Sequence, residues 1–132
     1  MIDSRIISEI LIEGLSDWLS FAEVNRYVRV SMKYEADEAA FDMTLQIIAE
    51  MLDKHFIEVG EIGVQPPRFL PWLEPCNSVV KRLRQRITET LPVTGIRPGD
   101  VCWIALTQIG SETATNFLAT HRAIKDHEQQ EQ

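Results

Sequence analysis

The chain lacks a run of about 20 consecutive apolar residues, the length that a membrane-spanning helix needs. Its first 20 residues also lack the basic start and uninterrupted apolar stretch of a signal peptide, because Asp3, Glu9, Glu13 and Asp17 interrupt them. We therefore expect a soluble, cytoplasmic protein that does not bind a membrane.

Cysteine is scarce, because Cys76 and Cys102 are the only two and lie far apart without a CxxC spacing. A disulfide is not expected in a reducing compartment, and a metal site would need further ligands at regular spacing. The sequence also has no HExxH, P-loop, GxGxxG or GxSxG motif. We expect two free thiols, no metal, no cofactor and no catalytic site, so that the protein is not an enzyme.

What is present fits one folded domain. A chain of 132 residues can bury a core without disulfides or metals, and its 45% hydrophobic and 25% charged residues are typical of globular proteins. We predict a single domain over residues 1–127, followed by a polar tail over 128–132.

Apolar residues at helical spacing predict five helices. The predicted helices span residues 4–15, 21–32, 37–52, 78–91 and 111–127. Ser20 and Glu23 have the spacing of a capping box before the second helix. The later helices have expected caps at Asp37, at Asn77 or Ser78, and at Ser111, with Pro92 ending the fourth helix. The third helix has the widest apolar stripe, so we expect it at the centre of the core.

Two segments rich in β-branched and aromatic residues predict strands that pair with each other, over residues 55–64 and 100–110. The second segment is apolar at nearly every position, which is typical of a strand buried on both faces. The proline-rich residues 64–75 between them predict an ordered loop, and residues 95–100 predict a turn.

The order of three helices, a strand, a long excursion, a second strand and a helix resembles the winged-helix family. The segment DVCWIALTQIGSETA is similar to the second wing strand of that family, with the Leu106-Thr107-Gln108-Ile109-Gly110 step leading into a C-terminal helix. This resemblance implies a mostly helical α+β fold: a three-helix core, a two-stranded wing, a helix inserted in the wing, and a C-terminal helix.

The segments DWLSFAEV, FIEVGEI, FLPW and VCWIALT also resemble small bacterial proteins, some of which are immunity proteins encoded beside contact-delivered toxins. This resemblance implies a non-enzymatic module that neutralises a cognate toxin by forming a tight complex. It assigns no role to any residue.

Acidic residues are concentrated where a winged helix would meet DNA. Residues 1–63 carry a net charge of −8, and residues 64–132 carry +1. The segment from residue 35 to residue 61 contains eight acidic residues and only one basic residue, Lys54. This charge would repel a phosphate backbone, so duplex DNA is not the expected partner. An acidic surface would instead be steered to a protein with a basic surface, such as a nuclease toxin domain.

We therefore predict a protein-binding site made of acidic residues and one tryptophan. Its candidate residues are Glu35, Asp37, Glu38, Asp42, Glu58, Glu61 and Trp72. Trp72 is chosen over Trp18 and Trp103 because its proline-bounded loop should lie on the surface, where large aromatic residues dominate binding. The alternatives are a solvated helix face for the acidic residues and core packing for all three tryptophans.

The sequence has one basic cluster, in and before the fourth helix. Its members are Arg68, Lys81, Arg82, Arg84 and Arg86. As an alternative function, the protein would be a winged-helix transcriptional or accessory regulator that binds nucleic acid through this helix. The cluster can also be interpreted as a solvated helix face with intramolecular ion pairs. For the chain as a whole, a dimeric structural subunit is a third possible function.

Overall fold

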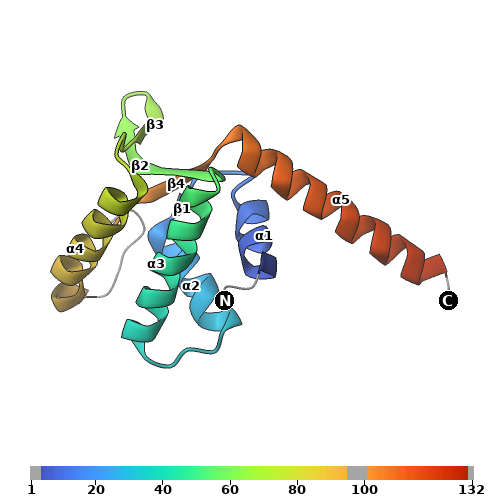
Figure 1. Cartoon of the computed structure of the whole chain (residues 1–132), viewed down its shortest axis with the longest axis horizontal. Helices are drawn as coiled ribbons and strands as arrows, with labels where there is room; N and C mark the ends of the chain where they lie inside the picture. The colour runs from blue at the N-terminus through green and yellow to red at the C-terminus, as the bar shows by residue number, and fades with distance from the viewer. Residues whose placement is uncertain (1–3, 95–100, 131–132) are drawn as a thin grey trace.

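In a computed structural model, residues 4–94 and 101–130 are described, and they have the expected α+β fold, with five helices and one four-stranded antiparallel sheet (Figure 1). The elements are α1 (Ser4–Glu13), β1 (Leu19–Ser20), α2 (Phe21–Ser31), α3 (Asp37–Asp53), β2 (Ile57–Val64), β3 (Pro67–Pro71), α4 (Cys76–Thr94), β4 (Trp103–Leu106) and α5 (Gln108–Gln130). Helix is the predominant structure. The turn predicted over residues 95–100 lies outside the described residues.

The sheet has the strand order β1-β4-β2-β3. The predicted pairing of the two apolar segments is confirmed, because Val59 of β2 lies opposite Ile104 of β4. The prediction of a two-stranded sheet is wrong, because β1 pairs with β4 and β3 pairs with β2.

Strand β3 lies in the segment that was predicted as a loop. Its prolines, Pro67 and Pro71, occupy the two ends of an edge strand, where a missing N–H is tolerated. Gly60 of β2 allows the close approach of β3, since a Cβ atom on it would lie 2.1 Å from the carbonyl oxygen of Leu70.

Local hydrogen bonds determine where helix α2 starts. The predicted capping box is confirmed: the Glu23 backbone N–H donates to the Ser20 hydroxyl at 3.1 Å, and the Ser20 N–H donates to the Glu23 carboxylate at 3.2 Å. The predicted Asp37 cap of α3 is wrong, because Ala36 is the N-cap and makes no side-chain cap bond. Asp37 is the first residue of the helix, and its carboxylate pairs with Arg29 instead.

Two further helix starts differ from the prediction. Helix α4 begins at Cys76, because the carbonyl of Pro75 accepts hydrogen bonds from the N–H groups of Ser78 and Val79 at 3.0 and 3.1 Å. Neither Asn77 nor Ser78 is the cap. The helix continues to Thr94, since a proline such as Pro92 disturbs a helix locally without always ending it.

Helix α5 begins three residues before the predicted start. The hydroxyl of Thr107 accepts from the Gly110 N–H at 3.0 Å and therefore takes the capping role that was expected of Ser111. The helix runs to Gln130, three residues into the predicted polar tail. Figure 1 shows it extending away from the other helices.

The core is centred on α3, as its wide apolar stripe predicts. This helix packs against α2, α4 and β2. Its buried residues are Ala40, Phe41, Thr44, Leu45, Ile47, Ile48 and Met51. Full burial of each large apolar side chain contributes roughly 1.5–3 kcal/mol, so α3 is the main source of hydrophobic stabilisation among the helices.

Candidate partner-binding surface

The structure separates the acidic candidate residues into two groups. Helix α3 starts at the end of the molecule remote from the sheet and runs toward the sheet (Figure 1). Its 17 residues span about 25 Å at the rise of an α-helix. Glu35, Asp37, Glu38 and Asp42 lie at the remote end, whereas Glu58 and Glu61 lie on β2. The predicted residues therefore do not form one surface.

Several of these acids already have a cationic partner within the chain. Asp37 pairs with Arg29, Asp42 pairs with Arg84 at 3.2 Å, and Glu61 pairs with Arg86 at 2.9 Å. Among the described residues, Glu35, Glu38 and Glu58 take part in no ion pair. These three remain available to a basic partner.

The exposed part of α3 is narrow. Glu38, Asp42 and Gln46 follow one another at helical spacing on its solvent side, while the packing of α2 and α4 covers its other sides. This stripe presents two carboxylates and no cation, so it offers a DNA backbone no phosphate contact. The expectation that duplex DNA is not the partner stays a prediction.

The basic cluster of α4 is largely neutralised by intramolecular ion pairs. Arg82 pairs with Glu74 at 2.7 Å, and Arg84 and Arg86 pair with Asp42 and Glu61. Within the described part of the chain, no ion pair involves Arg68 or Lys81. The geometry favours the interpretation as a solvated helix face, and nucleic-acid binding by this cluster stays a prediction.

Trp72 is half-buried against α4. The guanidinium carbons of Arg82 and Arg86 lie 3.9 and 4.8 Å from its ring centroid, and its indole N–H is buried without a hydrogen-bond partner. The side chain therefore holds the segment after β3 onto the helix. Its proposed contact with a partner stays a prediction.

The sheet has one buried face and one face toward solvent. Alternate residues of a strand point to opposite faces. In β2, Ile57 and Val59 are buried at 3% and 2% exposure, and Glu58 between them is exposed. In β4, Ile104 is buried at 1%, and its neighbours Trp103 and Ala105 are half-buried. The prediction that this strand is buried on both faces therefore holds for one face of β4, whereas its other face is only half-buried.

Aromatic rings gather on the face toward solvent. Glu58 lies opposite Ala105, and Ile62 lies opposite Phe69, so each pair shares a face. The ring of Trp18, directly before β1, lies 6.5 Å from the ring of Phe69. We call this surface the outer sheet face and define it by Trp18, Glu58, Ile62, Phe69, Trp103 and Ala105.

A hollow of about 360 Å³ adjoins the outer sheet face where β4 meets the turn after α1. Its lining includes Leu15, Asp17, Trp18 and Ala105. On this side of the sheet, the described strand residues include no lysine or arginine. The face and its hollow therefore combine aromatic and apolar groups with the carboxylates of Glu58 and Asp17.

Within residues 4–94 and 101–130, no three His, Cys, Asp or Glu side chains lie close enough together to hold a metal ion. In the same part of the chain, no helix has both the length and the apolar character to span a membrane. Comparison of the chain with known protein families, curated proteins and solved structures finds no match.

Proposed function

We propose that this chain is a non-catalytic protein-binding module, an immunity protein that neutralises a cognate bacterial toxin by binding it tightly through the outer sheet face. One observation carries the proposal: Trp18, Phe69 and Trp103 lie on the same face of the sheet as Glu58, and the described strand residues on this side include no lysine or arginine. Aromatic residues are the most frequent anchors of protein interfaces, and they attract Arg and Lys side chains through their ring faces.

The proposal includes a winged-helix variant as the fold. Helices α1 to α3 precede β2, and β2 pairs with β4, so these two strands stand where the resemblance implies the wing. Strand β3 and helix α4 are then an insertion. In such a fold α3 would read DNA, but its exposed stripe is acidic and α4 packs beside it.

The charge of the chain supports a basic partner. The net charge of −7 would raise the rate at which a basic toxin domain is captured. The unpaired carboxylate of Glu58 would then meet Arg or Lys side chains of that domain. Free thiols at Cys76 and Cys102 fit complex formation in the cytoplasm.

Co-expression with the product of the adjacent open reading frame tests this function. We expect the two proteins to co-purify as a stoichiometric complex on size-exclusion chromatography, and we expect cells to be protected from the toxicity of the neighbour. A neighbour that is toxic, yet is neither bound nor neutralised, contradicts the proposal.

The alternative function has a separate readout. At low salt, we expect no gel shift with duplex DNA or with RNA. A shift that Lys81→Ala weakens would instead favour a nucleic-acid-binding regulator acting through α4, because Lys81 is one of the two cluster cations outside the described ion pairs.

A further inference from the structure

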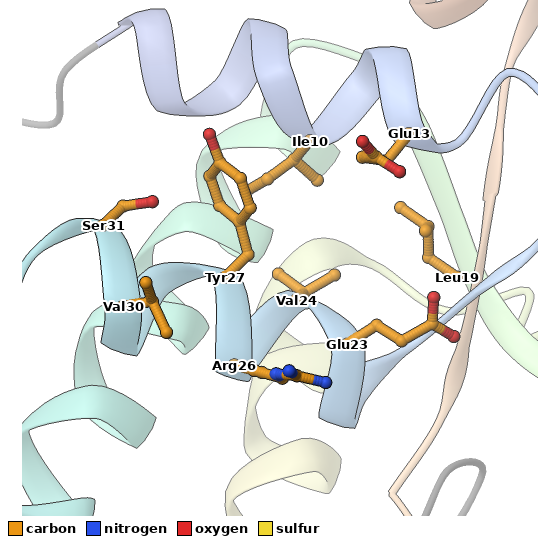
Figure 2. A pocket seen from close by; sticks show the side chains of 9 residues that line it. All are labelled: Ile10, Glu13, Leu19, Glu23, Val24, Arg26, Tyr27, Val30 and Ser31. Carbon is orange, nitrogen blue, oxygen red and sulfur yellow. The ribbon is translucent and has the colours of Figure 1, made fainter.

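A pocket of about 390 Å³ opens between α1 and α2, and none of its lining residues belongs to the set that defines the outer sheet face (Figure 2). This volume is within the range of small-molecule sites, which starts at roughly 300 Å³. The pocket is lined by Ile10, Glu13, Leu19, Glu23, Val24, Arg26, Tyr27, Val30 and Ser31. Its residues come from both helices and from β1, so the fold builds the pocket from three separate elements.

The inner wall of the pocket is apolar and closed. Ile10, Leu19 and Val24 are only 2%, 5% and 2% exposed, so they form a packed floor under the opening. At the rim, Val30 leaves 70% of its surface exposed, although it is a large apolar residue. The half-buried Tyr27 presents its ring to the same space (Figure 2). This combination suits an apolar or aromatic body of a ligand.

One end of the pocket carries two carboxylates. Glu13 of α1 and Glu23 of α2 reach into the same region near Leu19 (Figure 2). The Glu23 carboxylate is held in place, since its Oε1 accepts from the Ser20 N–H at 3.2 Å and lies 3.1 Å from the Ser20 hydroxyl. Arg26 also lines the pocket, so the lining carries two carboxylates and one guanidinium and keeps one net negative charge.

We propose that the α1–α2 pocket binds an organic cation with an apolar body. The ammonium or guanidinium group lies against Glu13 and Glu23, and the body lies against Val24 and the ring of Tyr27. Such a group can belong to a free amine or to a Lys or Arg side chain of a peptide. The site shares no residue with the outer sheet face.

The test uses 2-phenylethylamine, with 2-phenylethanol and 3-phenylpropionate as neutral and anionic probes with the same ring. Methyl signals of Leu19, Val24 and Val30 are followed by ¹H–¹³C NMR during titration. We expect the amine to shift these signals saturably at concentrations where neither other probe does. The peptide acetyl-Ala-Phe-Lys-Ala-amide forms a second arm, and the tighter binder of the two identifies a free amine or a peptide as the source.

Glu13→Gln supplies the decisive variant. It removes one carboxylate near the C-terminal end of α1, where loss of a negative charge favours the helix, so the protein should fold normally. We expect it to weaken amine binding roughly fivefold. Glu9→Gln is the matched control, because it removes the same charge from the same helix without lining the pocket. The proposal is overturned if the three phenyl probes bind equally or if the amine does not bind. It is also overturned if Glu13→Gln binds the amine as tightly as the wild type does.

Discussion

The rings of Trp18 and Phe69 meet with their centroids 6.5 Å apart, although Trp18 borders β1 and Phe69 belongs to β3 at the opposite edge of the sheet. Strands β4 and β2 lie between these two edges. The contact therefore crosses the outer sheet face, and it brings together residues that are 51 positions apart in the sequence.

A double-mutant cycle measures this contact. We expect Trp18→Ala and Phe69→Ala to be coupled by about 0.5–1.5 kcal/mol in the free energy of unfolding, as in other aromatic pairs. Urea denaturation of the wild type, both single variants and the double variant gives the coupling. Strict additivity would mean that the rings do not interact in solution.

The sequence predicted the elements whose signals are local. The apolar stripe of α3 and the capping box at Ser20 and Glu23 depend on residues within a few positions of each other, and both are confirmed. The pairing of β2 with β4 was also predicted, because both segments are strongly apolar. These elements form as predicted because their tertiary contacts favour the same local structure as their sequence patterns.

The elements that were missed depend on long-range contacts. Strand β3 brings the backbone of Leu70 close to Gly60 of β2, and no pattern in a proline-rich segment indicates that approach. The position of the candidate site residues also depends on long-range contacts. Glu58 and Glu38 looked equivalent in the sequence, but only the register of β2 against β4 places Glu58 beside Ala105 on the outer sheet face.

Gly110 has a tertiary role in the step from β4 to α5. A Cβ atom there would lie 2.0 Å from the carbonyl oxygen of Phe56, so we expect Gly110→Ala to lower the free energy of unfolding by about 1–3 kcal/mol. Gly63→Ala is the matched control, because its nearest neighbour is the flexible Leu70 side chain at 3.3 Å. Denaturation curves that rank the two variants equally would contradict this role.

The two thiols differ in their environment. Burial raises the pKa of Cys102 to about 12, against an opposing effect of Arg86. Partial burial, with a further contribution from Asp53, raises the pKa of Cys76. At pH 8 we expect Ellman's reagent to label Cys76 slowly in the folded protein and Cys102 only after unfolding, because the thiolate is the reactive form. Rapid labelling of both thiols in the folded state argues against this packing, and Cys76→Ser identifies the reactive thiol.

The same pKa shift makes stability depend on pH. The unfolded chain loses the Cys102 proton near the ordinary value of 9.0, whereas the folded chain keeps it up to about 12. The contribution of this thiol to stability is therefore complete below pH 9 and is lost as the pH rises toward 12. Cys102→Ala should flatten this part of the stability profile.

The central claim is that the outer sheet face binds a basic protein, and a pair of charge reversals tests it most directly. Glu58→Lys and Glu38→Lys change the same type of exposed carboxylate, and neither residue takes part in an ion pair of the described residues. Their affinities for the cognate partner are compared by isothermal titration calorimetry. We predict that Glu58→Lys weakens the complex at least tenfold, about 1.4 kcal/mol, and that Glu38→Lys leaves it within roughly twofold. Weakening by Glu38→Lys alone would contradict the claim and place the partner on α3.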